Sequence, residues 1–328
     1  VYELPEFKGL TGLLKKFCEI KKLASNAAHE SDCIIYRAPQ MESYCIFLFN
    51  QYDVPYAVEV TSDPLHDKMI TGILKTINVS LLKYMCKNAD GVSYVTEKYL
   101  QNFYPSGKSL EPSGNKFDSY YSSIVLEEDM IGEAKSYDNI AGRPFVLVHV
   151  ANAIENPSKG HYVAIQVIQK LIKTGRNVRI KFIGEGKMTD DLKRSVFDSG
   201  IQDNVIFTGK IADRQILLDE MRNSDLMLFP TKNEGLPRTI IEAQAVGVPI
   251  VSTPVGGIPE LVEQKHLREP DDVEGFVDLV SWLMDNPQEL EEMSKRGLEN
   301  ARKYTDEVLT ARRSEFYAQL KKRAEGKS

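Results

Sequence analysis

Two glutamates near the start of one predicted helix are the residues in this sequence best suited to chemistry. Glu234 and Glu242 lie in the stretch NEGLPRTIIEAQAVGVPIVSTPVGG, which begins at Asn233. Pro237 predicts the first position of a helix. An amide hydrogen at that position would have no partner within the helix, so proline loses nothing by lacking it. The amides at a helix start bind phosphate, and carboxylates accept the paired hydroxyl hydrogen bonds that sugars offer. The stretch therefore predicts a nucleotide-sugar site.

The spacing within this stretch predicts which group holds which part of such a ligand. Glu242 follows Pro237 by just over one helical turn, so the two carboxylates reach different parts of one crevice. The helix amides would hold a diphosphate, one glutamate a hexose and the other a ribose. A structural alternative stays open from spacing alone, in which Glu234 complements the helix dipole and Glu242 is a solvated carboxylate. The amides expected to contribute are those of Leu236, Arg238 and Thr239.

The helices and strands that must position these residues are predicted to be those of an α/β protein. A chain of 328 residues exceeds one hydrophobic core, so two domains are expected. From residue 145 onward, strand-length apolar runs alternate with helical patterns such as 161–175, which predicts βαβ units and a parallel sheet. Residues 105–144 are expected to form an interdomain segment. The five strands expected in the second half are 145–150, 177–184, 204–209, 225–230 and 248–253.

The first third carries a similar but less complete pattern. Strands are expected at 32–38 and 56–62, with helices between them. Since an open parallel sheet normally holds more strands, and the chain opens on Val1, we expect the first strands of this domain to be missing. Three helical stretches close the chain from about 272 to 325, and the last is expected to pack on the first domain. The expected divisions are 1–142, 143–303 and a C-terminal helix over 304–328.

Composition excludes several classes of function. The formal net charge of −6 argues against general nucleic-acid binding, and no apolar run is long enough to span a bilayer. Residues 301–328 hold eight Lys or Arg against four Asp or Glu; this basic helix is expected to be a solvated face that can assist peripheral membrane contact. The four cysteines show no CxxC spacing, so reduced thiols are expected rather than a zinc site or disulfides. They are Cys18, Cys33, Cys45 and Cys86.

A family resemblance covers residues 145–325. The stretch NEGLPRTIIEAQAVGVPIVSTPVGGIPELV resembles the E-x7-E signature of retaining glycosyltransferases of the GT-B fold, the group 1 enzymes of family four. FIGEGKMTDDL resembles the family's strand, glycine-rich turn and helix, and NVIFTGKI its base-binding loop. The resemblance implies two Rossmann-like, doubly wound domains that face a cleft, with the amino-terminal domain incomplete here.

The resemblance also implies roles for single residues of the second half. Glu234 would contact the donor sugar and Glu242 the ribose hydroxyls. Lys159, in NPSKGH, matches the lysine that stabilises the leaving diphosphate, and it is expected to be catalytic together with Glu234. The family's arginine six residues earlier is Ala153 here, so another cation such as Arg238 is expected to substitute, unless the donor is held less strongly or differs. Further donor-binding residues are expected at Gly184, Gly186, Lys210, Ile211, Gly235, Leu236 and Thr239.

The first half contains the expected acceptor side. VPYAVEVTSDPLHD and GVSYVTEKYL resemble the acceptor domain of the same family. Ser62 and Asp63 take the place of a family histidine, so both are acceptor-side candidates and Asp63 is an expected catalytic residue. His66 is a third candidate that would approach by loop geometry, although a surface histidine is the plainer interpretation. His149 is expected to be a satisfied core residue; no motif includes the three other histidines, His29, His161 and His266.

The expected activity is transfer of a hexose-type sugar from a nucleotide diphosphate sugar to an acceptor hydroxyl, with retention of configuration. UDP is favoured by family frequency. The acceptor would be a glycan or lipid-linked glycan in bacterial capsule, lipopolysaccharide or other surface polysaccharide synthesis, which places the enzyme in the cytoplasm, with peripheral contact at the inner face of the membrane. No D-x-D motif lies in a suitable loop, so no metal cofactor is expected.

Two other functions stay open at this level. A nucleotide-sugar 2-epimerase of the same fold would bind the donor without an acceptor. A catalytically weak nucleotide-sugar-binding subunit would fit Ala153, Ser62 and the missing start. A NAD-dependent oxidoreductase is disfavoured, because no G-x-G-x-x-G follows a first strand.

Overall fold

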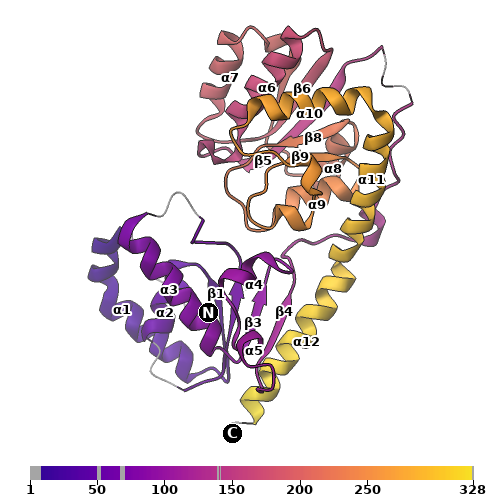
Figure 1. Ribbon diagram of the computed structural model, residues 1–328. Coiled ribbons are helices and arrows are strands. Elements are labelled where there is room, and N and C mark those ends of the chain that lie inside the picture. The colour runs from indigo at the N-terminus through magenta and orange to yellow at the C-terminus, as the bar shows by residue number, and fades with distance from the viewer. Residues whose placement is uncertain (1–8, 50–52, 67–70, 139, 141, 327–328) are drawn as a thin grey trace. The chain divides into compact units, whose positions relative to one another are not determined.

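The computed structural model describes residues 9–49, 53–66, 71–138, 140 and 142–326. The chain divides into two compact units. The first unit comprises residues 1–123 and 309–328, and the second comprises residues 124–308. Each is built around its own parallel sheet, with helices connecting the strands (Figure 1). The expected α/β fold class is confirmed.

The first unit holds a four-stranded parallel sheet in the order β1-β2-β3-β4. Residues 105–144, expected to form an interdomain segment, contain β4, so that expectation was wrong for this part of the range. The tetrapeptide FDSY of β4 is too short to show a strand period, and its pairing with β3 decides its conformation. The elements are α1 (Gly9–His29), β1 (Ile34–Ala38), α2 (Met41–Phe49), β2 (Tyr56–Val60), α3 (Gly72–Asn88), β3 (Gly91–Tyr94), α4 (Tyr99–Phe103), α5 (Gly107–Leu110) and β4 (Phe117–Tyr120).

The long C-terminal helix α12 (Asp306–Glu325) packs on this first unit with its basic residues. The guanidinium of Arg312 lies 4.2 Å from the ring centroid of Tyr120, and Arg313 lies over Tyr121. Phe316 also packs edge-on against Tyr121 at 5.9 Å. Part of the tail's positive charge therefore lies against aromatic rings of the unit and does not form a freely solvated face.

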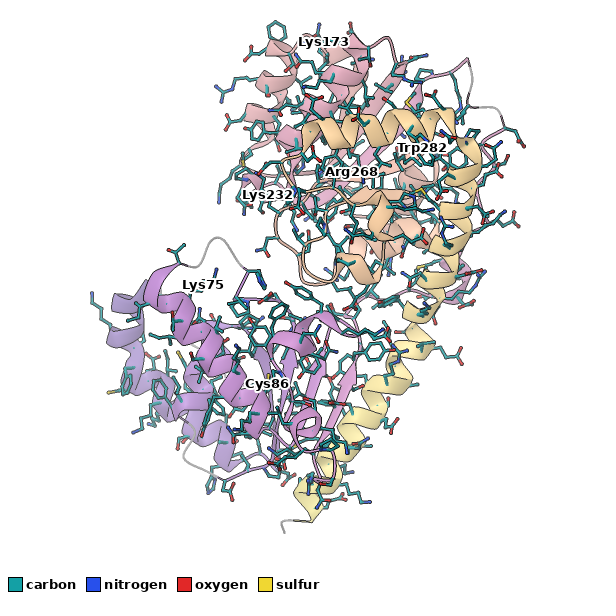
Figure 2. The ribbon with its side chains drawn as sticks, viewed as in Figure 1. Lys75, Cys86, Lys173, Lys232, Arg268 and Trp282 are labelled. Atoms are coloured by element: carbon teal, nitrogen blue, oxygen red, sulfur yellow. The ribbon has the colours of Figure 1, made fainter. Side chains whose placement is uncertain are left out.

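The interior of the first unit is apolar and contains two of the cysteines. Cys45 and Cys86 are buried, and Cys86 lies inside the unit in Figure 2. Cys18 and Cys33 are also free thiols, so the expectation of unpaired cysteines is confirmed. None of the helices in the described part of the chain is long and apolar enough to cross a bilayer.

The second unit holds a five-stranded parallel sheet in the order β7-β6-β5-β8-β9. All five strands expected from the sequence are present. Because the chain moves outward from β5 to β7 and then returns to β8 and β9, right-handed crossovers place the helices before the reversal on one face of the sheet and the helices after it on the other. The elements are β5 (Phe145–Ala153), α6 (His161–Lys173), β6 (Val178–Glu185), α7 (Thr189–Asp198), β7 (Val205–Gly209), α8 (Arg214–Arg222), β8 (Leu226–Phe229), α9 (Arg238–Ala245), β9 (Ile250–Ser252), α10 (Val273–Asp285) and α11 (Pro287–Ala301).

The central strands of this sheet are buried on both faces, as expected for a parallel sheet covered by helices. Every residue of the inner strand β8 is buried, and so is every residue of the edge strand β9. One core cluster joins alternate residues of β5, such as Phe145 and Leu147, to apolar side chains of α6 and α10. The near-continuous apolar runs in the sequence are therefore explained by burial on two faces.

The start of α9 differs from the expected one by one residue. Pro237 has a ψ of 113° and stands before the helix, so Arg238 is the first helical residue. A proline at this position ends the extended loop after β8, while the amides at the start of α9 still lack partners within the helix.

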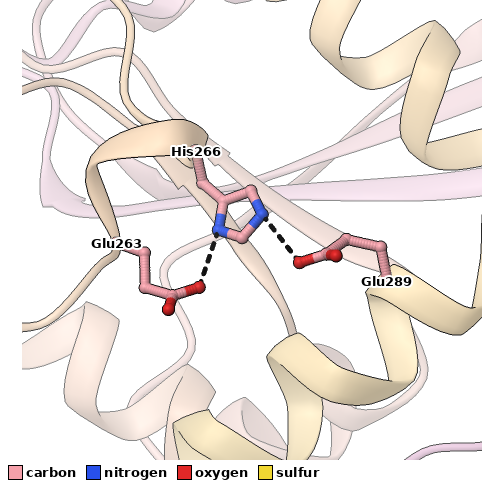
Figure 3. A group of neighbouring side chains, drawn as sticks. All are labelled: Glu263, His266 and Glu289. Carbon is pink, nitrogen blue, oxygen red and sulfur yellow. Dashed lines mark ion pairs between the residues drawn. The ribbon is translucent and has the colours of Figure 1, made fainter.

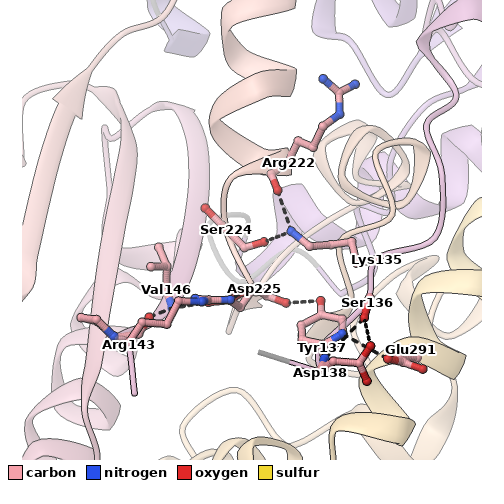
Figure 4. Close-up of polar contacts among 11 residues, drawn as sticks. Lys135, Ser136, Tyr137, Asp138, Arg143, Val146, Arg222, Ser224, Asp225 and Glu291 are labelled. Atoms are coloured by element: carbon pink, nitrogen blue, oxygen red, sulfur yellow. Dashed lines mark hydrogen bonds and ion pairs between the residues drawn. The ribbon is translucent and has the colours of Figure 1, made fainter. Parts of the chain in front are cut away.

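Within the second unit, the segment that precedes β5 is attached by a buried carboxylate at the amino end of β8. Asp225 accepts hydrogen bonds from both terminal nitrogens of Arg143, at 2.7 and 2.6 Å, and from the backbone amide of Val146 at 2.7 Å (Figure 4). The hydroxyl of Tyr137 donates to the carbonyl oxygen of Asp225 at 2.6 Å. Lys135 donates to two carbonyls nearby, and burial lowers the pKa of its ammonium. These contacts tie Lys135, Tyr137 and Arg143 to the edge opposite the carboxyl ends of the strands.

We expect Asp225→Ala to lower the free energy of unfolding of the second unit by about 2–4 kcal/mol, because it leaves a guanidinium and a buried amide without their acceptor. Urea unfolding followed by circular dichroism measures the change.

Asp219→Ala is the matched control, since Asp219 pairs with Arg222 on the exposed surface of α8 and should contribute less than about 0.5 kcal/mol. Equal losses in the two variants would contradict a special role for Asp225.

Candidate functional site

The strand order of the second unit determines where a ligand site can form. The strand order reverses between β5 and β8. These two strands are neighbours in the sheet, although 72 residues lie between the end of β5 and the start of β8. Open α/β sheets bind ligands outside the carboxyl ends of the strands at such a reversal. The loops at this point are residues 154–160, after β5, and residues 230–237, after β8.

Lys159 and Glu234, which come from these two loops, form an ion pair. The ammonium of Lys159 donates to Oε1 of Glu234 at 2.6 Å. Their side chains are 32% and 11% exposed, so both remain accessible from solvent while the carboxylate is mostly enclosed. The structure therefore brings together two of the three residues that the sequence predicts to be catalytic.

The short turn that carries Lys159 is stabilised by a hydrogen bond at its start and by close backbone packing at its end. The side chain of Asn156 accepts from the amide of Ser158 at 2.9 Å and caps the 3-10 turn Pro157–Lys159. Gly160 follows with a φ of 79°, and a Cβ there would lie 2.0 Å from the carbonyl oxygen of Pro230. Only glycine allows the loop after β5 to approach the loop after β8 this closely.

The loop that carries Glu234 is fixed by buried hydroxyl groups and by a second glycine. Thr231 donates to Oε1 of Glu234 at 3.3 Å, and Thr253 after β9 donates to the carbonyl of Thr231 at 2.7 Å. A Cβ on Gly256, whose φ is 57°, would lie 2.1 Å from the carbonyl oxygen of Glu234. The carboxylate therefore projects from a backbone that the residues after β8 and β9 constrain.

Two buried histidines lie beneath the ion pair. Nε2 of His149 lies 2.8 Å from the carbonyl oxygen of Lys159, which can only accept, so Nε2 carries the proton. The ring of His161 lies 4.2 Å from that of His149. Burial lowers the pKa of His149 to about 4. Burial, with the ammonium of Lys159 as a smaller cause, lowers the pKa of His161 to about 2. His149, expected to be a core residue, is thus neutral and positions the backbone of Lys159.

Glu242 lies deeper in the same unit and faces a cation that the sequence analysis missed. Its carboxylate is 16% exposed and lies 3.6 Å from Nη2 of Arg214, the first residue of α8. Burial raises the pKa of Glu242, and the charges of Arg214 and Arg238 oppose that rise. The signal available in the sequence was the position of Arg214, four residues after Lys210 in the loop assigned to base binding.

The other donor-side residues lie at the carboxyl edge of the same sheet. Gly184, near the end of β6, lies against the backbone of β5. A Cβ on Gly184 would lie 1.7 Å from the carbonyl oxygen of Ala151, so packing by itself requires glycine at this position. Ala153 is exposed and supplies no charge. Arg238 is exposed at the start of α9, while Leu236 is buried. Gly186 follows β6, Lys210 and Ile211 follow β7, and Gly235 and Thr239 flank the start of α9.

The first unit gathers the acceptor-side candidates around one buried carboxylate after β2. Asp63 is 3% exposed and accepts from the hydroxyls of Tyr104 at 2.6 Å and Tyr99 at 2.8 Å. His66, with a side chain 54% exposed, lies 2.6 Å from Asp63 through Nδ1. Although burial raises the pKa of Asp63, hydrogen bonds led by that from Tyr104 hold it below its usual value. Ser62 lies beside it, partly exposed. The carboxylate anchors the loop, and His66 is the exposed member of the group.

One further group, among the residues that the structure describes, has the ligand types and spacing of a metal site. Donor atoms of Glu263, His266 and Glu289 all lie within 4.8 Å of one another (Figure 3). Arg296 lies 3.1 Å from Glu263 and 2.9 Å from Glu289, and Lys265 lies 2.8 Å from Glu289. Two cations therefore already neutralise these carboxylates, and the group acts as an ion-pair network that joins α11 to the loop after β9.

Comparison with known proteins adds a family and a fold. Residues 144–286 match the family model of glycosyl transferases group 1. Protein CapJ of Staphylococcus aureus is 28% identical over 326 residues, which are 97% of this chain and 80% of that protein. The amylovoran biosynthesis glycosyltransferase AmsK of Erwinia amylovora is 34% identical over 129 residues, which are 37% of this chain and 30% of that protein.

The solved structures give the fold. HepE of Anabaena, in a complex with UDP and glucose, superposes with a TM-score of 0.66 at 17% identity, over 99% of this chain and 84% of that one. This likeness confirms the expected GT-B fold.

We expect the second unit to lose stability as the pH falls from about 6.5 towards 4. In the unfolded chain histidine takes up a proton near pH 6.5, whereas folded His149 and His161 remain neutral to about pH 4 and 2. Each of them lowers the free energy of unfolding by up to about 1.4 kcal/mol per pH unit in this window. His161→Leu should therefore reduce the loss between pH 6.5 and 5 in calorimetric unfolding.

The control is His29→Gln, which changes an exposed histidine of α1 and should leave this pH dependence as it is. An unchanged slope in His161→Leu would show that His161 is not neutral in the folded protein.

Proposed function

Because residues 144–286 belong to the glycosyl transferases of group 1, we propose that this glycosyltransferase moves a hexose-type sugar from a nucleotide diphosphate sugar to an acceptor hydroxyl with retention of configuration. We further propose UDP as the nucleotide and a bacterial surface glycan or lipid-linked glycan as the acceptor. The observation that carries the proposal is the Lys159–Glu234 pair at the reversal between β5 and β8, with Glu242 near it on α9.

Lys159 and the start of α9 supply positive potential where a diphosphate would depart. The ammonium of Lys159 lies outside the carboxyl end of β5, and the amides of Arg238 and Thr239 open α9 from the neighbouring loop. Fixed donors of this kind stabilise negative charge as it develops on a leaving group, without reorganisation during the reaction. A diphosphate held between them would leave more readily from the anomeric carbon.

Glu234 is suited to hold the sugar rather than to attack it. Its Oε1 is already 2.6 Å from the ammonium of Lys159, which lowers its strength as a nucleophile, and sugar hydroxyls can donate to the free positions of the carboxylate. In the reaction we propose, the bond from the anomeric carbon to the diphosphate oxygen breaks. The acceptor oxygen bonds to that carbon on the same face, and its proton passes to the departing phosphate oxygen.

In the first unit, His66 and Asp63 are the groups that we assign to the acceptor side. His66 is exposed and hydrogen-bonded to the buried Asp63, so the carboxylate orients the ring while the other ring nitrogen is available to a hydroxyl. Asp63 thereby acts through His66 as a positioning residue.

The relatives support the donor and the biological setting. HepE, which shares the fold, was crystallised with UDP and glucose, and AmsK is named for amylovoran biosynthesis. Ala153 favours a second candidate, a nucleotide-sugar-binding subunit of low activity, because it removes a cation expected beside Lys159. An epimerase of the same fold would consume donor without any acceptor.

We expect calorimetric titration of the chain to show binding of UDP in preference to GDP. Glu242→Ala should weaken binding about tenfold or more, since a carboxylate hydrogen-bonded to a ribose hydroxyl contributes about 1.5–3 kcal/mol.

Glu292→Ala is the matched control and should bind UDP as the wild-type chain does, because Glu292 pairs with Lys295 on the exposed surface of α11. Failure of both nucleotides to bind would reject the donor proposal, and preference for GDP would replace UDP.

We expect transfer to proceed undiminished in EDTA, because Lys159 and the helix amides supply the charge that a metal would supply. The assay pairs UDP-hexoses with a panel of saccharide and polyol acceptors, and proton NMR of the product should show the anomeric configuration of the donor.

Loss of transfer in EDTA that manganese restores would contradict the metal-independent mechanism, and an inverted anomer would contradict retention. Conversion of the donor without acceptor would favour the epimerase. Binding without any turnover would favour the binding subunit.

A further inference from the structure

Gln244 is a buried polar side chain on α9, two residues after Glu242. Its Nε2 donates to the carbonyl oxygen of Leu261 at 2.6 Å, and its Oε1 accepts from Nδ2 of Asn300 on α11 at 2.9 Å. Since a backbone carbonyl can only accept, Nε2 must face Leu261, and this fixes the orientation of the amide. Gln244 therefore joins α9 to two other parts of the unit, the segment after β9 and α11.

The surroundings of Gln244 show that it is not there to fill volume. Gly297 of α11 lies against it, and a Cβ on that glycine would lie 3.3 Å from Cγ of Gln244. A cavity of about 50 Å³ borders the side chain, and Leu261 and Gly297 are among its other lining residues. A well-packed core leaves few such voids, so an apolar side chain could fill this space better than an amide does. Hydrogen bonds are therefore what glutamine contributes at this position.

The carbonyl that accepts from this amide belongs to a compact turn that begins at the loop carrying Glu234. At the start of the turn, the amide of Gly257 donates to the carbonyl oxygen of Gly235 at 2.6 Å. The 3-10 turn Ile258–Glu260 follows, and the amide of Leu261 closes it on the carbonyl of its first residue at 2.9 Å. A displacement at one end of so short a hydrogen-bonded segment reaches the other end.

These contacts close a ring that begins and ends at the Glu234 loop. The chain runs from this loop into α9, the side chain of Gln244 crosses to Leu261, and the turn leads back to Gly235. Residues 230–237 are not helical, so α9 by itself does not determine where Glu234 lies. The hydrogen bond from Gln244 supplies the missing constraint between the helix and the loop.

We propose that Gln244 is a positioning residue, which sets the place of the Glu234 carboxylate relative to α9 and thereby how tightly the site holds the donor's sugar. This inference rests on the proposed function, because that function assigns Glu234 to the hexose. Gln244 acts through Leu261, the turn and the backbone of Gly235, and does not contact the donor.

The first test needs no ligand. Gln244→Met keeps the length of the side chain but removes the donor to Leu261 and the acceptor for Asn300. We expect hydrogen exchange of the amides in residues 254–262 to become about tenfold faster, since losing a buried hydrogen bond favours local opening by about that factor. Mass spectrometry of the intact folded chain, followed by digestion, measures the exchange.

The second test compares UDP with UDP-glucose and UDP-N-acetylglucosamine in calorimetric titrations without acceptor. In Gln244→Met, we expect the UDP-sugar that the wild-type chain binds more tightly to lose about tenfold in affinity, and UDP less than threefold. The difference arises because a displaced Glu234 loses its contact with the hexose, whereas the groups proposed to hold the nucleotide stay in place. A general loss of stability would affect the ligands alike.

Two further variants separate positioning from stability. Ser294→Ala removes another buried hydrogen bond of α11, to the carbonyl of Gly247 at 2.6 Å, without touching the turn. It should lower the thermal unfolding temperature about as much as Gln244→Met does, and leave the exchange of residues 254–262 and the ratio of the affinities as they are. Asn300→Leu spares the bond to Leu261, so exchange there should rise less than about threefold.

Three results would overturn the inference. The first is unchanged exchange of residues 254–262 in a folded Gln244→Met, because the glutamine would then not hold the turn. The second is an equal loss of affinity for UDP and the UDP-sugar. The third is the same pair of changes in Ser294→Ala. If the wild-type chain binds no nucleotide, the proposed function and the sugar-holding role both fail, while the exchange measurement still decides whether Gln244 holds the turn.

Discussion

The contact between Lys159 and Glu234 depends on a property of the sheet rather than of either side chain. β5 and β8 are neighbours because the strand order reverses between them, so two loops far apart in the chain meet at one edge. The ion pair at 2.6 Å places a cation and a carboxylate at that edge. Glycines at 160 and 256 and buried hydroxyls at 231 and 253 allow the loops to approach and then hold them. Without the reversal these residues would have no reason to meet.

The electrostatics of the site follow from how deeply each group lies. His149 and His161 are buried next to the Lys159 turn and are neutral. Lys159 is therefore not repelled by a second positive charge from either histidine. Glu242 and Arg214 are more enclosed than Arg238. The site thus combines an accessible charged pair, Lys159 and Glu234, with a more enclosed one.

The two units use a buried carboxylate in different ways. Asp225 ties Tyr137, Arg143 and Val146 to the amino end of β8 and stabilises the unit. Asp63 arranges Tyr99, Tyr104 and His66 after β2, and so shapes a loop at the carboxyl end of its sheet. In both cases the aspartate is almost fully enclosed and accepts several hydrogen bonds. These hydrogen bonds offset the free-energy cost of burying the charge.

The sequence by itself determined the fold class and the five strands of the second unit, and it predicts roles for Glu234, Glu242 and Lys159. Apolar runs of strand length and the spacing around Pro237 are local features, and local features are what a sequence displays directly. It did not reveal β4, since four residues of mixed polarity show no period. It also did not reveal the partners of the site residues. Arg214 against Glu242, His149 beneath Lys159 and the tyrosines around Asp63 are contacts between distant segments. Only the tertiary structure decided them, because strand order and loop packing determine which side chains meet and no local pattern records that choice.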